Sequence, residues 1–225
     1  MPWLGLFHKI ALADEFCLFD DVQYLKKDWN NRNKIKTTAG EVWLSVPVFT
    51  TDHREKKIRE IEIDNSSNWS KKHFKSIYLN YKKAPYFKDY IDFFDDVYKK
   101  EWKYLTDLND YMLKWFLKEL GIKVKYIKAS DYDFKGQKSD LVLDMCEVLK
   151  ADTYIFGKLG EDYADKETFS KAGVAIHFQN YNHPEYEQLH GEFIPYMSVV
   201  DLLFNCGKKS LDIITKGNIC KIKES

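Results

Sequence analysis

Short apolar runs alternate with longer helical patterns in the second half of the chain, and this alternation constrains the fold more than any other feature. Residues 124–127, 153–156 and 174–178 are rich in valine, isoleucine and aromatic side chains, as expected for buried strands. Helical patterns over residues 139–150 and 166–171 separate these runs. Strands that alternate with helices predict βαβ units.

The first half of the chain predicts a strand pair instead. Residues 33–36 and 42–48 have strand composition, and Thr38-Ala39-Gly40 lies between them as a turn. We therefore expect an α/β fold in a single compact domain over residues 1–225, with a mixed sheet, N-terminal hairpin-like strands and C-terminal βαβ units. Further helices are predicted at about residues 3–13, 69–80, 85–98, 102–120 and 197–205.

Composition excludes several classes of protein. Among 225 residues, 35 basic side chains balance 35 acidic ones, so no net charge recruits nucleic acid or a membrane surface. No apolar run reaches membrane-spanning length, and the N-terminus lacks a signal-peptide pattern, so we expect no membrane insertion and a cytoplasmic location. The four cysteines show no paired spacing, which predicts reduced thiols, and the aromatic richness makes a homodimer plausible.

A polar segment, Asp20 to Asn33, lies between two apolar strand-like runs. A simple connector would use glycine, proline and serine, and this segment has none of them. It carries amides that donate and accept hydrogen bonds, an arginine fork suited to carboxylate or phosphate, and aromatic faces. A ligand-binding segment and a solvated loop with its own Asx turns are both compatible with this pattern.

A second polar segment begins at Tyr181. His183 precedes a proline, so its backbone is held extended, and a loop histidine can accept a proton near neutral pH. A surface histidine without a catalytic role is the alternative. Further along, Ser198 and Asp201 have the spacing of a capping box, with Ser198 as the N-cap of a helix.

Most catalytic templates are missing from the sequence. There is no glycine-rich dinucleotide fingerprint, no phosphate-loop lysine and no nucleophile elbow. Asp131-Tyr132-Asp133 has the bare spacing of a metal-binding carboxylate pair, although a solvated acidic turn explains it equally well. Cys206 is predicted to lie at a packed helix end. We therefore predict neither a metal site nor a cofactor.

Several blocks, in order along nearly the whole chain, resemble the WbqC-like protein family. They are Pro2 to Ile10, Asp20 to Tyr24, Trp29 to Asn33, Trp43 to Val48, His183 to Gln188 and Phe193 to Gly207. The resemblance implies a place in bacterial surface-polysaccharide or O-antigen biosynthesis. It also implies attachment of an aminoacyl group such as glycyl, or an acyl group, to an amino sugar that is nucleotide-linked. Relatives carry a segment resembling His-Gln-Pro-x-Tyr-Leu at the start of this pattern, which this sequence enters at Met1. Either the start of this sequence is misassigned or truncated, or this member has lost part of a site, which would weaken or abolish its activity.

This chemistry assigns a role to each candidate residue. A transferase needs a base for the amine, donors for the carbonyl oxygen and anchors for the acceptor. The expected catalytic residues are His183 as general base and Asp21, which would orient a substrate ammonium or pair with Arg32. The expected substrate-binding residues are Asn30, Arg32 and Asn33 for sugar or phosphate, Gln23 and Gln188 as orienting amides, and Trp29 or Tyr186 as a stacking face.

For these roles to be shared, the two polar segments must line a common cleft. Two other classes of function stay open at this stage. One is a glycosyltransferase-like or other nucleotide-sugar enzyme. The other is a non-catalytic, nucleotide-sugar-binding partner of a polysaccharide assembly complex.

Overall fold

The strands pair in short units rather than in one broad sheet. A computed structural model describes residues 1–26, 28–51 and 54–216. Within them, three two-stranded sheets are formed. Strand β1 (Glu15–Leu18) pairs in parallel with β4 (Lys125–Lys128), and β2 (Arg32–Thr37) pairs antiparallel with β3 (Gly40–Ser45). Strand β5 (Thr153–Phe156) pairs in parallel with β6 (Ala175–Phe178).

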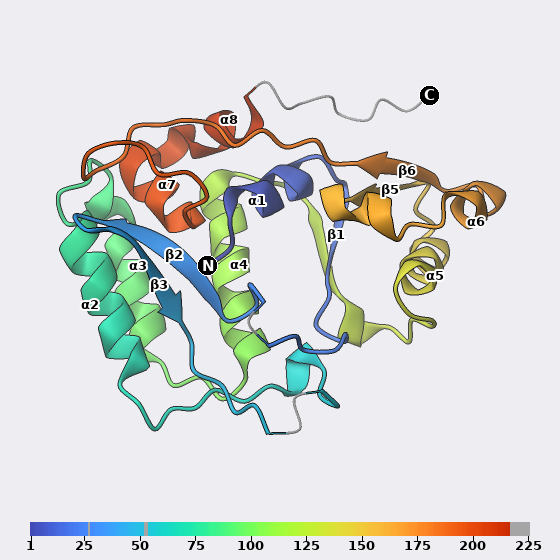
Figure 1. Ribbon diagram of the computed structural model, residues 1–225, viewed down its shortest axis with the longest axis horizontal. Helices are drawn as coiled ribbons and strands as arrows, with labels where there is room; N and C mark the ends of the chain where they lie inside the picture. Colours follow the sequence, from blue (N-terminus) through green and yellow to red (C-terminus); the bar gives the residue numbers. More distant parts are fainter. Residues whose placement is uncertain (27, 52–53, 217–225) are drawn as a thin grey trace.

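Helices surround these sheets and join them. In chain order they are α1 (Leu4–Ala11), α2 (Trp69–Tyr81), α3 (Phe87–Lys99), α4 (Leu105–Leu120), α5 (Ser139–Leu149), α6 (Lys166–Lys171), α7 (Val199–Cys206) and α8 (Ser210–Thr215). Two short 3-10 helices are important for the site, η1 (Ile58–Glu60) and η2 (Ala129–Asp131). In Figure 1 the β2–β3 hairpin, α2 and α3 lie on the left, and β5, β6, α5 and α6 lie on the right. Helices α1 and α4 and strand β1 lie between these groups.

The predicted α/β class is confirmed, as are the hairpin and the second of the two predicted βαβ units; the first does not form, because β4 pairs with β1 and not with β5. The hairpin turns where expected, with Thr37 opposite Gly40. The segment β5–α6–β6 is a βαβ unit with parallel strands. The predicted mixed sheet does not form: parallel and antiparallel pairing both occur, but in separate two-stranded sheets within the described residues.

The aromatic side chains that are unusually frequent in this chain fill the main core. Phe204 of α7 stacks on Tyr81 of α2 at 5.1 Å between ring centroids and lies 5.5 Å from Phe94 of α3. Phe94 in turn lies 6.3 Å from Phe116 of α4. A second, smaller cluster around Phe156 and other buried side chains packs α5 and α6 against the β5–β6 pair. Aromatic content therefore contributes chiefly to packing between helices.

Helix α7 ends at a position that requires glycine. Gly207 has φ +56° and ψ −132°, and a Cβ there would lie 2.4 Å from Cδ1 of Tyr86. Gly121, which ends α4 as predicted, also has a positive φ, of +72°, but a Cβ there would meet nothing within 4 Å. A side chain at Gly121 would therefore meet only the cost of an unfavourable φ, whereas one at Gly207 would meet that cost and a steric overlap as well.

We expect Gly121→Ala to cost about 1 kcal/mol of unfolding free energy, because only the left-handed backbone is disfavoured. Gly207→Ala should cost about 3 kcal/mol or more, because the added methyl group also overlaps a packed ring. Urea unfolding followed by circular dichroism measures both losses. Equal losses would contradict the overlap with Tyr86.

Candidate functional site

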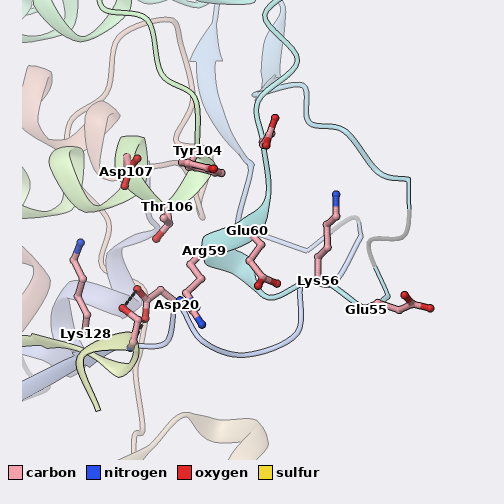
Figure 2. Close-up of a pocket in the computed structure, with 11 residues that line it drawn as sticks. Asp20, Glu55, Lys56, Arg59, Glu60, Tyr104, Thr106, Asp107 and Lys128 are labelled. Atoms are coloured by element: carbon pink, nitrogen blue, oxygen red, sulfur yellow. Dashed lines mark hydrogen bonds between the residues drawn. The ribbon is translucent and has the colours of Figure 1, made fainter. Parts of the chain in front are cut away.

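A cleft of about 860 Å³ opens at the carboxyl ends of the parallel strands β1 and β4. Its other walls are η1, with the residues that flank it, and the first turn of α4. The lining side chains carry charges of both signs together with hydroxyl groups (Figure 2): Asp20, Glu55, Lys56, Arg59, Glu60, Glu62, Tyr104, Thr106, Asp107, Lys128 and Ser130. Ligands in open α/β folds commonly bind beyond the carboxyl ends of parallel strands.

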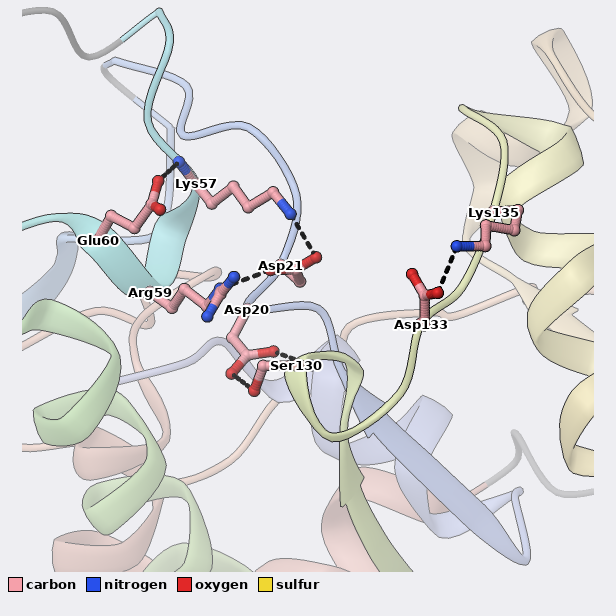
Figure 3. Close-up of polar contacts among 8 residues, drawn as sticks. All are labelled: Asp20, Asp21, Lys57, Arg59, Glu60, Ser130, Asp133 and Lys135. Atoms are coloured by element: carbon pink, nitrogen blue, oxygen red, sulfur yellow. Dashed lines mark hydrogen bonds and ion pairs between the residues drawn. The ribbon is translucent and has the colours of Figure 1, made fainter.

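The buried carboxylate of Asp20 holds the two strand ends together. Its Oδ1 accepts a hydrogen bond from Ser130 N at 2.9 Å, and its Oδ2 accepts one from Ser130 Oγ at 2.6 Å. Asp20 follows β1 and Ser130 follows β4, so the pair fixes the floor of the cleft (Figure 3). The main-chain oxygen of Asp20 also accepts a hydrogen bond from Arg59 N at 2.9 Å, which fastens η1 to the same point.

The neighbouring carboxylate, Asp21, binds two cations of the η1 segment. Its Oδ1 lies 2.5 Å from Arg59 Nε, and its Oδ2 lies 2.6 Å from Lys57 Nζ. Partial burial alone would raise the pKa of Asp21. The hydrogen bond from Lys57 and the positive charge of Arg59 outweigh this effect, so the pKa lies below its usual 3.8. Glu60 completes the group, because its Oε2 accepts a hydrogen bond from Lys57 N at 2.8 Å.

On the opposite wall, Lys128 belongs to a group centred on Asp110 of α4. Asp110 Oδ2 lies 3.0 Å from Lys128 Nζ and 2.9 Å from Lys114 Nζ, and Oδ1 accepts a hydrogen bond from the Tyr126 hydroxyl at 2.7 Å. Burial would raise the pKa of Asp110, but these hydrogen bonds and positive charges lower it. The charge of Lys128 is therefore partly balanced within the protein.

The polar segment that the sequence singled out follows the edge of this region. Gln23 Nε2 donates a hydrogen bond to the main-chain oxygen of Arg54 at 2.7 Å. The main-chain oxygen of Asn30 accepts one from Asn109 Nδ2 of α4 at 2.9 Å. Asn33 is buried, and its Nδ2 donates to the main-chain oxygen of Met1 at 2.6 Å.

Trp29 and Arg32 lie together on the surface of the hairpin. The ring of Trp29 is 55% exposed and lies 5.4 Å from that of Trp43 on β3. The guanidinium carbon of Arg32 lies 4.6 Å from the Trp43 ring centroid, a cation–π arrangement. The stacking face predicted for Trp29 is thus accessible, next to a second indole.

His183 has hydrogen-bond partners at both ring nitrogens. Its Nδ1 lies 2.9 Å from the main-chain oxygen of Pro184, so Nδ1 carries the proton, and Nε2 accepts a hydrogen bond from Tyr196 N at 3.1 Å. Burial lowers the pKa of His183 from 6.5. The side chain is therefore a neutral imidazole at pH 7, and its accepting nitrogen is engaged with the backbone.

The capping box predicted for Ser198 and Asp201 is wrong. Ser198 is the N-cap of α7 but makes no side-chain cap hydrogen bond. The carboxylate of Asp201 instead accepts hydrogen bonds from the hydroxyls of Tyr81 at 2.7 Å and Tyr186 at 2.9 Å, and from Gln188 Nε2 at 2.8 Å. The Asp201 carboxylate does not reach back to the N-cap because three donors from α2 and the 186–188 loop bind both of its oxygens.

This network contains two of the predicted substrate-binding residues. Tyr186 and Gln188 use their polar atoms to satisfy Asp201, which is fully buried. Burial raises the pKa of Asp201, while the hydrogen bonds that it accepts oppose that rise. The sequence carried a signal for this network, because an aspartate within the apolar run of α7 must find buried partners.

The second polar segment and the start of α7 pack against β2, just beyond the first polar segment. Ser198 N donates a hydrogen bond to the main-chain oxygen of Lys34 at 3.0 Å, and Lys36 Nζ donates to the main-chain oxygen of Glu192 at 2.5 Å. These contacts are buried packing rather than an open cavity. None of the predicted site residues lines the large cleft. Asp21 is connected to the cleft only through its ion pair with Arg59, which does line it. Sequence reasoning did not single out Arg59, Lys128 or Ser130, because their neighbours are distant in the chain.

The cysteines within the described residues are free and poorly suited to nucleophilic chemistry. Burial raises the pKa of Cys17 to about 12 and those of Cys146 and Cys206 to about 11, so the thiolate is scarce near neutral pH. Cys220 lies outside the described residues.

No cluster of three or more histidine, cysteine or acidic side chains in the described ranges is placed to hold a metal ion. Over the same residues, the helices are too short or too polar to cross a membrane.

Comparison with known proteins identifies the family. The model of the WbqC-like protein family matches residues 1–213. The chain belongs to the WbqC-like protein family. It is 35% identical over 216 residues to the uncharacterized protein Rv1507c of Mycobacterium tuberculosis, a match that covers 95% of this chain and 93% of that protein. No solved structure matches the chain significantly.

The Asp201 network of this WbqC-like protein yields a stability prediction. Tyr186→Phe removes a donor to a buried carboxylate and should lower the unfolding free energy by about 1–3 kcal/mol. Tyr132→Phe is the control, because the Tyr132 side chain stacks on Phe134 and its hydroxyl makes no hydrogen bond within the described residues. It should change stability by no more than about 0.5 kcal/mol. Equal losses in urea unfolding would contradict a stabilising role for the network.

Proposed function

We propose that this WbqC-like protein is a cytoplasmic transferase. It would attach an aminoacyl group such as glycyl, or an acyl group, to the amino group of a nucleotide-linked sugar for bacterial surface polysaccharide. The observation that carries the proposal is the cleft, which places carboxylates, cations and hydroxyls around one volume of about 860 Å³. An amino sugar joined to phosphate needs all three kinds of partner. Family membership supports the same chemical context.

The carboxylates of the cleft match the amino group of such an acceptor. Asp20 is fixed by Ser130, and Asp107 lies in the first turn of α4. Both line the cleft, and because Asp20 is engaged by Ser130, the sugar ammonium would lie against Asp107 with its charge balanced. The hydroxyl of Thr106, which also lines the cleft, is the proposed partner for a sugar hydroxyl, because that of Ser130 already donates to Asp20.

Transfer requires that the ammonium lose a proton before its nitrogen attacks the carbonyl carbon of the donor. The nitrogen–carbon bond then forms, and the donor's leaving group departs. Asp107 is the proposed proton acceptor because its carboxylate lines the cleft. His183, the base expected from the sequence, does not line the cleft, and its Nε2 accepts a hydrogen bond from Tyr196 N.

A binding protein without turnover is the second candidate. The observation that favours it is the engagement of both His183 ring nitrogens with the backbone, away from the residues that line the cleft. Such a protein would use the cleft to hold the amino-sugar nucleotide and present it to a partner enzyme. Product formation separates the two candidates.

The decisive experiment supplies UDP-glucosamine with three donor mixtures in turn, which are glycine plus ATP, glycyl-tRNA, and acetyl-coenzyme A. Mass spectrometry detects the modified sugar. We expect product from one mixture, and a rate lowered about tenfold or more by Asp107→Asn. Asp133→Asn, on a loop outside the cleft, is the control and should keep the full rate.

Ligand binding without product from any mixture would favour the binding protein. Full activity of Asp107→Asn, with the fold intact by circular dichroism, would remove the cleft from the mechanism.

A further inference from the structure

We propose that Arg59 is the phosphate-binding centre of the cleft, and that Asp21 is the positioning residue that holds Arg59 in place. This inference rests on the proposed function, because it names how a phosphate-linked acceptor would be recognised. It assigns phosphate recognition to η1 rather than to Arg32, whose guanidinium lies over the Trp43 ring.

The guanidinium of Arg59 is held at one edge and open at the other. Its closest ion-pair contact is from Nε to Asp21 Oδ1, at 2.5 Å, and the side chain remains 45% exposed where it lines the cleft. An arginine fork carries five N–H donors in a plane. With Nε engaged, the terminal amino groups have the geometry to bind two oxygens of one phosphate.

The segment that carries Arg59 is fixed before any ligand arrives. Ile58 N donates a hydrogen bond to the main-chain oxygen of Val22 at 2.9 Å, and Arg59 N donates to that of Asp20 at 2.9 Å. Asp21 also binds Lys57, which keeps its carboxylate in a single orientation (Figure 3). A fixed arginine loses little conformational entropy on binding, which favours affinity.

The charges around Arg59 are consistent with an anion at this end of the cleft. Two nearby carboxylates are already engaged, Asp20 by Ser130 and Glu60 by the main-chain N–H of Lys57. Lys56, three residues before Arg59, also lines the cleft (Figure 2).

The ligand class that follows is a phosphate ester, with its phosphate at Arg59 and its cationic or hydroxyl-bearing part toward Asp107. Inorganic pyrophosphate tests the phosphate chemistry alone, and UDP tests the nucleotide form. Isothermal titration calorimetry at low salt measures both. We expect Arg59→Met to weaken binding of each probe roughly tenfold to hundredfold, because a charge-assisted bidentate contact is lost. Arg59→Lys should restore only part of the affinity, because lysine cannot form the fork.

Asp21→Asn distinguishes positioning from simple charge. Removal of a negative charge near an anion site would by itself strengthen binding of pyrophosphate. Loss of the support for Arg59 should instead weaken binding, by about threefold to tenfold, and should have no further effect in the Arg59→Met background. Asp133→Asn removes a carboxylate that pairs with Lys135 on a loop outside the cleft, so it should leave affinity unchanged.

Unchanged affinity in Arg59→Met would overturn the phosphate site, and unchanged or stronger binding in Asp21→Asn would overturn the positioning role. These outcomes are separable from failure of the proposed function. Acyl transfer to free glucosamine, with no Arg59-dependent binding of phosphate, would retain the transferase and remove this site. Arg59-dependent binding of UDP without any transfer would retain this phosphate site and remove the transferase.

Discussion

The bond between the Asp20 carboxylate and Ser130 is the constraint on which the candidate site depends. It joins the ends of two parallel strands whose sheet has no further strand to support it within the described residues. Because the main-chain oxygen of Asp20 also binds η1, the same residue places Arg59 against the strand ends. A carboxylate that accepts both a backbone N–H and a hydroxyl is rigid, so it can define the floor of a cleft.

Three aspartates have different roles because their surroundings differ. Asp20 is buried and connects two strands, while Asp21, next in sequence, faces two cations and has a lowered pKa. Asp201 is buried among tyrosine hydroxyls and an amide, and its pKa is raised. Only Asp21 combines partial exposure with a cationic partner that lines the cleft, which is why it has a natural role in positioning.

The WbqC-like fold places its polar groups in two regions of different character. Around Asp201, tyrosine hydroxyls and an amide satisfy one buried charge and fasten the loop of residues 186–188 to α7. Around the cleft, charges are paired but partly exposed, so a ligand can exchange places with water there. The first arrangement stabilises the fold, and the second is available for binding.

The sequence by itself determined the class of fold and many of its local elements. The period of apolar residues identified β5, α6 and β6, glycine marked the end of α4, and ordered blocks of residues identified the family. It also drew attention to the segment from Asp20 to Asn33, two of whose carboxylates organise the cleft. Only the tertiary structure decided that Asp20 binds Ser130, that Asp21 binds Arg59, and that Asp201 binds Tyr81 rather than capping its own helix. Periodicity records which face of an element is apolar. A hydrogen bond between side chains 110 or 120 residues apart depends on how those elements pack, which no local pattern encodes.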